Sequence, residues 1–243
     1  MSNQFSYENI LPIAPLKVAA LEGCRDLAEN VDRFLVEFRE KSNPDFPDTP
    51  TFQGYHEDSY LVRSACPRFG TGEAKGILYD SVRGVDLFIM ADITNYSLTY
   101  TVCGHENHMS PDDHYQDLKR VISATNGKAR RINVIMPFLY ESRQHKRTRR
   151  ESLDCALGLQ ELISMGVDNI ITFDAHDPRV QNSIPLHGFE TVQPAYQFIK
   201  GLFKAEPDLK VDSDSLMIIS PDAGGTSRAI YLANVLEIGR AHV

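Results

Sequence analysis

Three short segments of the chain carry residue types that bind phosphate groups and divalent cations. Arg143–Arg150 reads Arg-Gln-His-Lys-Arg-Thr-Arg-Arg, and guanidinium groups bind phosphate oxygens in bidentate fashion. The segment 174–177, Asp-Ala-His-Asp, and the later Asp222 offer carboxylates and an imidazole. These could hold Mg²⁺, which keeps its waters and substrate phosphates and so needs few protein ligands. The glycines that follow Asp222, at the start of a predicted helix, let backbone N–H groups approach a phosphate closely.

Each of these segments also has a purely structural interpretation. The basic run could be a solvated loop or a local nucleic-acid patch, and the aspartates could cap helices or turns. The segment 222–227 is not a Walker A loop, because the Gly-Lys-Ser/Thr ending is missing. Cys103, His105 and His108, followed by Asp112, Asp113 and His114, suggest a transition-metal site. They have no familiar zinc spacing, so we expect a surface loop there.

A fourth segment, Arg68–Glu73, is a glycine-containing turn with an aromatic and an acidic residue. Phe69 could stack on a nucleobase, and Glu73 could accept a hydrogen bond from an exocyclic amine. The structural alternative is a core phenylalanine and a solvated glutamate.

The hydrophobic pattern predicts the elements that must position these segments. Buried apolar strands alternate with helices, which is typical of a mostly parallel sheet covered on both faces. Ligands of such sheets bind outside the carboxyl ends of the strands, and three of the segments follow predicted strands directly. We predict strands over 13–20, 60–66, 85–90, 132–138, 170–173 and 216–219, helices over 27–38, 152–165 and 226–236, and a loop over 43–55.

Composition excludes several other classes of protein. The 243 residues are 42% hydrophobic and 24% charged, with a net charge of −8, which does not fit a disordered, collagenous or general nucleic-acid-binding chain. The four cysteines form no CxxC pair and do not indicate a disulfide framework. With no signal peptide pattern and no apolar run near the ~20 residues of a membrane helix, we expect a cytoplasmic protein that binds neither membranes nor nucleic acids.

Taken together, the segments resemble ribose-phosphate pyrophosphokinases (phosphoribosyl pyrophosphate synthetases). The resemblance rests on the basic run with Arg143 and Gln144, on Asp174-Ala-His176, and on Ser220-Pro-Asp222-Ala-Gly224-Gly225. It also rests on the Phe69–Glu73 turn, followed by Ser81-Val-Arg-Gly84. These motifs follow one another in the family's order from about residue 16 to residue 236.

The resemblance implies an α/β fold with two tandem phosphoribosyltransferase-type domains and mostly parallel sheets. The first domain would span 1–190, and the second would begin at 191–236 and be incomplete. The implied reaction moves diphosphate from ATP to C1 of ribose 5-phosphate, with Mg²⁺ as cofactor, and gives phosphoribosyl pyrophosphate and AMP for nucleotide biosynthesis. The implied partners are ATP, ribose 5-phosphate and further copies of the chain, with the ATP site at a subunit interface. The ATP-binding residues carried over are Phe69, Gly72, Glu73, Arg143 and Gln144, and the metal ligands are His176 and Asp222.

The sequence also departs from the family pattern. Gly70, Thr71 and His145 stand where the family usually has serine, aspartate and aspartate, and 41–57 and 94–117 look longer than usual. The family's catalytic lysine loop and sugar-phosphate loop have no counterpart here. We therefore expect a divergent, C-terminally truncated chain, inactive by itself, with residues 237–243 as a non-native tail. The alternative is a non-catalytic regulatory homologue that assembles with active subunits.

Overall fold

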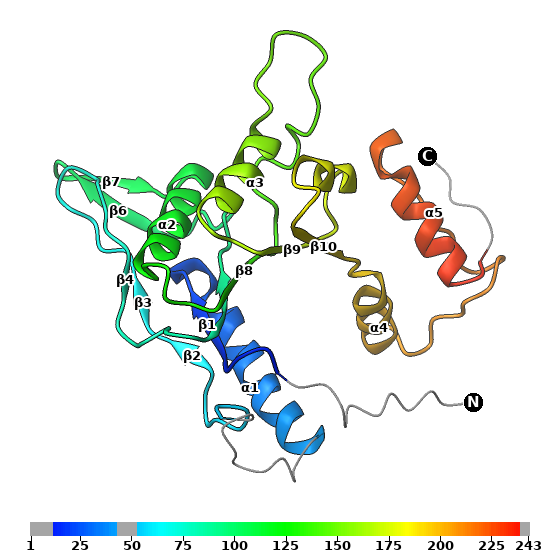
Figure 1. The fold of residues 1–243 in the computed structure, drawn as a ribbon. Coiled ribbons are helices and arrows are strands. Elements are labelled where there is room, and N and C mark those ends of the chain that lie inside the picture. Colours follow the sequence, from blue (N-terminus) through cyan, green and yellow to red (C-terminus); the bar gives the residue numbers. More distant parts are fainter. Residues whose placement is uncertain (1–11, 43–52, 239–243) are drawn as a thin grey trace. The chain divides into compact units, whose positions relative to one another are not determined.

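The protein is described here by a computed structural model that covers residues 12–42 and 53–238. The chain divides into two compact units, one ending at Val192 and the other beginning at Gln193 (Figure 1). Most of the loop predicted over 43–55 and most of the tail predicted over 237–243 lie outside the described residues. The prediction that the domains divide at residue 190, with a second phosphoribosyltransferase-type domain following, stays a prediction.

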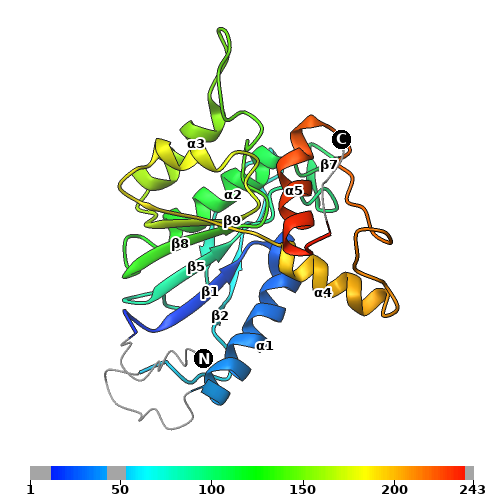
Figure 2. The same ribbon diagram turned by 90° about the vertical axis from the view of Figure 1, so that its right-hand side faces the viewer.

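A six-stranded, all-parallel sheet forms the centre of unit 1. Its spatial order is β10-β9-β8-β5-β1-β2, and Figure 2 shows several of these strands side by side. This architecture confirms the predicted α/β class. The strands are β1 (Leu16–Ala20), β2 (Leu61–Val62), β5 (Asp86–Met90), β8 (Arg131–Met136), β9 (Asn169–Phe173) and β10 (Gly188–Val192).

Helices cover the sheet because its strands carry apolar side chains on both faces. On one face α2 (Pro111–Ala124) and α3 (Asp154–Ser164) bury Leu118 and Leu159 against Leu87 of β5 and Val134 of β8. On the other face α1 (Arg25–Ser42) packs Ala28 near Val18 and Met90. Two 3₁₀ turns, η2 (Glu22–Cys24) and η3 (Pro178–Ser183), complete the connections.

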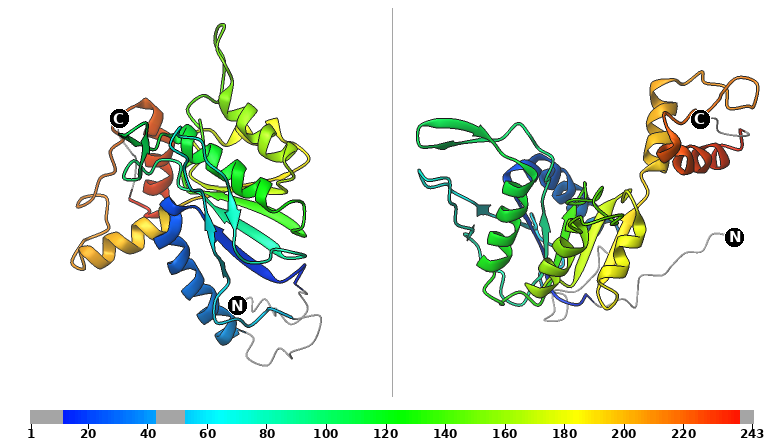
Figure 3. Two further views of the ribbon diagram at one scale, coloured as in Figure 1. Left: turned by 90° about the vertical axis from the view of Figure 1, so that its left-hand side faces the viewer. Right: turned by 90° about the horizontal axis from the view of Figure 1, so that it is seen from above.

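Two small antiparallel pairs lie outside the main sheet. One joins β3 (Ser64–Ala65) to β4 (Ile77–Leu78), and the other is the hairpin of β6 (Thr99–Val102) and β7 (His105–His108). The hairpin turns at Cys103 and Gly104, which have φ angles of 51° and 84°, as expected for a two-residue turn with both residues left-handed. The hairpin projects from the rest of unit 1 in Figure 1 and in the view from above in Figure 3.

Unit 2 contains α4 (Ala195–Ala205), the 3₁₀ turn η4 (Ala223–Gly225) and α5 (Thr226–Val235). The helix predicted over 226–236 is therefore confirmed. The buried strand predicted over 216–219 is wrong, because no strand forms there and Met217 and Ile219 are exposed. An apolar run makes a strand only when a neighbouring strand can accept its backbone hydrogen bonds, and no strand is present among the described residues of unit 2.

Most other predicted elements of unit 1 are confirmed with small shifts of their ends. The strand predicted over 60–66 is split, because β2 joins the main sheet while β3 pairs with β4. The surface loop expected around Cys103–His114 is wrong, since it forms the β6–β7 hairpin and the first turn of α2. Across the part of the chain that the structure describes, none of the helices is both long and apolar enough to span a membrane.

Candidate nucleotide site

The loop that carries the basic run follows β8, at the carboxyl edge of the sheet. Gln144 holds the two ends of this loop together. Its side-chain amide donates to the main-chain carbonyl of Ser152 at 2.6 Å, and its main-chain carbonyl accepts from the main-chain amide of Cys155 at 3.4 Å. Within the loop, Thr148 donates to the carboxylate of Glu151. Gln144 therefore has a structural role here in addition to its predicted contact with ATP.

The basic side chains of this loop are directed to solvent. All five are exposed, and the loop stands out above α3 in Figure 1. A cluster of exposed guanidinium and ammonium groups beside a strand end is suited to bind a multiply charged anion. These residues are Arg143, Lys146, Arg147, Arg149 and Arg150.

The turn after β9 lies beside this basic loop. The Nε2 atom of His145 is 3.5 Å from Oδ2 of Asp177, and the ring centroids of His145 and His176 are 5.2 Å apart. Asp177 also accepts from Nε of Arg179 at 2.9 Å and caps η3 through the amide of Arg179. The structure thus brings two of the three predicted strand ends together, with His176 next to the residues that follow Arg143.

Hydrogen bonds determine the electrostatics of this turn. Those from Arg179 hold the pKa of the Asp177 carboxyl well below its usual range, so the group is ionised at neutral pH. At Glu141, just before the basic loop, burial and the neighbouring carboxylates of Asp154 and Asp112 raise the pKa of the carboxyl instead. Asp177 therefore supplies negative charge beside the His145 ring.

The loop with Phe69 and Glu73 forms a tight turn in another part of unit 1. The amide of Phe69 donates to the carbonyl of Glu73 at 2.7 Å, and the amide of Gly72 donates to the carbonyl of Phe69 at 2.9 Å. Phe69 is 52% exposed, so the core alternative for this side chain is wrong. Thr71 donates its hydroxyl to the carboxylate of Glu73 at 3.1 Å.

The third predicted strand end belongs to unit 2. Asp222 caps η4, because its Oδ1 accepts from the amide of Gly225 at 2.8 Å. A β-carbon at Gly225 would lie 2.7 Å from Oγ of Ser220, so this tight loop requires glycine. The capping alternative for Asp222 is thus realised, and its predicted role as a metal ligand stays a prediction.

The described residues do not form a metal site in which protein side chains supply all the ligands. None of their histidine, cysteine and acidic side chains gather in a group of three that could hold a metal ion, which counts against the transition-metal interpretation of Cys103–His114. There, His105 and His108 are exposed on β7, whereas His114 is buried and bonded to the carbonyl of Asn95. A cation that takes most of its ligands from phosphate and water, as Mg²⁺ does, needs few protein ligands. The predicted ligands His176 and Asp222 belong to different units, and their role stays a prediction.

Sequence reasoning missed two contributors to the site. It treated His145 only as a departure from the family pattern, although the structure places this residue against both His176 and Asp177. It also missed the β6–β7 hairpin, which lies against the 68–74 loop. The Cys103-Gly104 pair between two four-residue stretches is the signal that would have predicted a two-residue hairpin turn.

Comparison with known proteins decides the family. Residues 16–166 match the family described as the N-terminal domain of ribose phosphate pyrophosphokinase. The chain belongs to this family. The matched segment contains all of β1 through α3, and therefore both the Phe69–Glu73 turn and the basic loop.

Individual relatives agree with the family assignment. The chain is 28% identical to a ribose-phosphate pyrophosphokinase of Maricaulis maris over 182 residues, which cover 74% of this chain and 52% of the relative. It is 27% identical to the Staphylococcus haemolyticus enzyme of the same name over 227 residues, covering 91% and 57%. It is 30% identical to ribose-phosphate pyrophosphokinase 1 of Candida albicans over 182 residues, covering 73% and 50%. The chain thus spans about half the length of the curated relatives it matches.

A solved structure shares the fold. The phosphoribosylpyrophosphate synthetase from Mycobacterium smegmatis superimposes with a TM-score of 0.68 at 20% identity, covering 94% of this chain and 64% of that one. This likeness confirms the fold class of the chain.

Proposed function

We propose that this chain is the ATP-binding part of a ribose-phosphate diphosphokinase, which transfers diphosphate from ATP to C1 of ribose 5-phosphate and releases AMP. The observation that carries the proposal is the carboxyl edge of the sheet, where the loop with five exposed cations contacts His176 through the ring of His145. Transfer of a phosphoryl-type group depends mainly on positioning and on neutralising charge. The cations at this edge would neutralise the negative charge of the phosphates.

Individual residues have distinct roles in this proposal. Arg143 and the exposed cations that follow it bind phosphate oxygens, and Gln144 holds the loop while it faces the nucleotide. Phe69, Gly72 and Glu73 border the adenine base, in a site that a second copy of the chain completes. His176, and separately Asp222 of unit 2, would each offer a ligand to Mg²⁺, which would supply charge neutralisation when bound. The cytoplasmic location stays a prediction.

A second function is favoured by one observation in the Phe69–Glu73 turn. Thr71 donates to one oxygen of the Glu73 carboxylate and so competes with the adenine amine for this group. A regulatory homologue, which keeps the fold and assembles with active subunits, would tolerate this change because it need not bind ATP productively.

The first experiment is an ATP titration of the 243-residue chain by calorimetry, with and without Mg²⁺. We expect wild-type protein to bind ATP, and Arg143→Ala to bind it about tenfold more weakly, as for the loss of one charge-assisted contact. Arg130→Ala is the matched control, because Arg130 is exposed just before β8, at the opposite edge of the sheet. ATP binding that is equal in both variants, or absent in wild-type protein, would contradict the proposed site.

A second experiment separates the enzyme from the regulatory homologue. AMP formation from ATP and Mg²⁺ is measured for the protein encoded by the complete reading frame, with and without ribose 5-phosphate, and again with a ribose-phosphate pyrophosphokinase added. The proposal expects the protein encoded by the complete reading frame to form AMP only when ribose 5-phosphate is present. A complete protein that forms no AMP but changes the rate of the added enzyme would be the regulatory homologue.

A further inference from the structure

The β6–β7 hairpin packs directly on the loop that carries two of the proposed adenine contacts. The amide of Cys103, at the hairpin turn, donates to the carbonyl of Gly70 at 3.0 Å. Gly72 has a φ angle of +91°, and a β-carbon there would lie 2.9 Å from a methyl carbon of Val102. The hairpin and the loop are thus joined by a backbone hydrogen bond at Gly70 and by the Val102 side chain, which leaves no room for a larger residue at position 72.

Arg68 fixes the base of the same loop. Its guanidinium forms two hydrogen bonds with the carboxylate of Asp117, at 2.9 and 3.0 Å, and lies 4.8 Å from the ring centroid of Tyr100. The Arg68 side chain is 11% exposed and that of Asp117 is 6% exposed, so the ion pair is shielded from water. A cation held over an aromatic ring at such a site is worth more than one at an exposed site.

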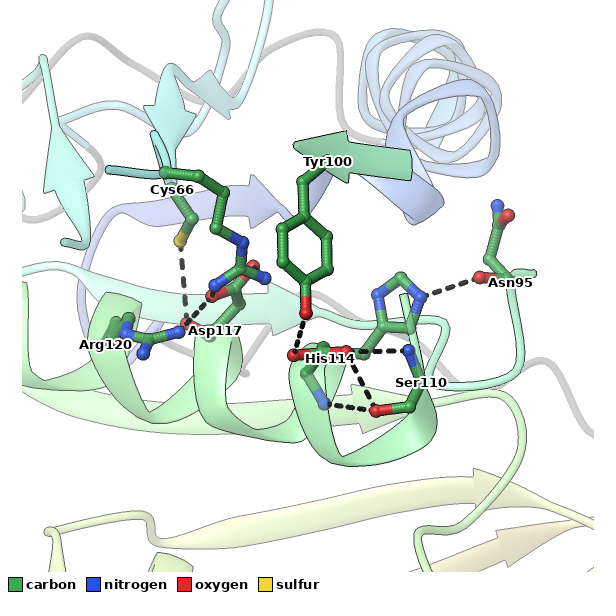
Figure 4. A network of polar contacts seen from close by, with 9 residues as sticks. Cys66, Asn95, Tyr100, Ser110, His114, Asp117 and Arg120 are labelled. Carbon is green, nitrogen blue, oxygen red and sulfur yellow. Dashed lines mark hydrogen bonds and ion pairs between the residues drawn. The ribbon is translucent and has the colours of Figure 1, made fainter. Parts of the chain in front are cut away.

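The hairpin is itself anchored on α2. The hydroxyl of Tyr100 donates to Asp113 at 3.2 Å, and Asp113 forms a reciprocal capping box with Ser110 at the start of the helix. Figure 4 shows the Tyr100 side chain extending from β6 toward this end of the helix. Burial raises the pKa of Asp117, while Arg68 and Arg120 oppose the rise by holding its charged form.

These contacts form one continuous connection from α2 to the 68–74 loop. We propose that the β6–β7 hairpin sets the conformation of the Phe69–Glu73 turn, with Tyr100 as the positioning residue that acts through Arg68. The inference rests on the proposed function in one respect, because it makes the turn an adenine-binding element.

Hydrogen exchange of the two amides that close the turn, those of Phe69 and Gly72, tests the inference without any ligand. Tyr100→Ala removes the ring under Arg68, so we expect both amides to exchange about five- to tenfold faster, the range for losing a partly desolvated cation–π contact. Tyr100→Phe keeps the ring and loses only the bond to Asp113, so we expect less than a twofold change. Tyr96→Ala is the matched control, because Tyr96 stacks on His108 of the same hairpin.

A second variant covers the case in which Tyr100→Ala fails to fold. Arg68→Lys keeps a positive charge beside Asp117 but loses the planar, two-bond geometry, and we expect faster exchange at the same two amides. Exchange of the Val134 amide in β8 reports global unfolding and is expected to stay unchanged. Exchange at Phe69 and Gly72 that equals wild type in both variants would overturn the inference.

Measuring the ATP affinity of the same variants then tests whether the contacts from α2 to the 68–74 loop affect nucleotide binding. We expect Tyr100→Ala to weaken ATP binding about fivefold and Tyr100→Phe to leave it within twofold of wild type. Faster exchange with unchanged ATP affinity would overturn the positioning role. Wild-type protein that binds no ATP would instead refute the proposed function, and the exchange measurement would still decide how the turn is held.

Discussion

The two edges of the central sheet use polar residues in opposite ways. At the amino edge the carboxylate of Asp86 accepts from Nε of Arg131 at 2.8 Å and from the side-chain amide of Asn133 at 2.7 Å. The network continues across β8, because Asn169 donates to Asn133 at 2.6 Å. At the carboxyl edge the cations of the 143–150 loop are exposed. The polar groups of one edge bond to one another and support the fold, whereas the charges of the other edge are exposed to solvent.

The largest effect should come from breaking the amino-edge network. Asp86 is 7% exposed, and Asp86→Ala would leave Arg131 and Asn133 without their shared acceptor. Removing one partner of a largely buried ion pair costs about 3 kcal/mol, so we expect the free energy of unfolding in urea to fall by that amount. A loss below about 0.5 kcal/mol, the range of ordinary surface substitutions, would show that this edge is not the stabilising one.

A smaller effect is expected from Gly188→Ala, at the first residue of β10. A β-carbon there would lie 2.0 Å from Oδ1 of Asn169, and Asn169 cannot turn aside without losing its bond to Asn133. Overpacking of this kind costs about 2 kcal/mol, which thermal unfolding can measure. Gly127→Ala is a poor control because of its left-handed φ angle of 64°. Gly201→Ala in α4 serves better, since a β-carbon there meets nothing within 4 Å.

The carboxyl edge should respond in the opposite sense. A combined Arg149→Ala and Arg150→Ala variant should keep its free energy of unfolding within about 0.5 kcal/mol, as is usual for exposed residues. Its affinity for ATP should fall about tenfold, and the remaining affinity should depend less on salt, because fewer charges are screened. A large loss of stability together with unchanged affinity would abolish the distinction between the edges.

The smallest effect concerns the pH dependence of stability through Asp177. The folded pKa of this carboxyl lies below its unfolded value of about 3.9. Its contribution is therefore complete above that value and is lost as pH falls through the folded pKa. Asp177→Asn should flatten the fall in the free energy of unfolding between about pH 5 and pH 2. The difference from wild type should be less than about 1 kcal/mol, because Arg179 is largely exposed. Identical pH profiles for variant and wild type would rule out this contribution.

The sequence predicts the main sheet well because its strands are short apolar runs that end in recognisable motifs. The segments over 85–90, 132–138 and 170–173 all become central strands, and the basic loop and His176 meet because adjacent parallel strands end at one edge. The strand expected at 216–219 fails for the complementary reason: an apolar run extends into a strand only beside another strand, and here only an isolated bridge forms, at Ile219.

Local patterns could not predict the contacts around the Phe69–Glu73 turn. The link between Arg68 and Asp117 joins residues 49 positions apart, and no spacing rule connects them. Glu73 and Gln144 were identified by type, but their engagement by Thr71 and Ser152 depends on loop conformations that only the folded chain defines.

The order of strands also bears on how the chain folds. β1 lies between β2 and β5, and its Leu16 pairs with Asp86, about 70 residues away. Such pairing requires a long loop to close before any contact compensates for the lost entropy, and topologies rich in distant pairs fold slowly. During synthesis on the ribosome, the first strand must therefore wait until about half of the matched domain has been made before β5 can pair with it.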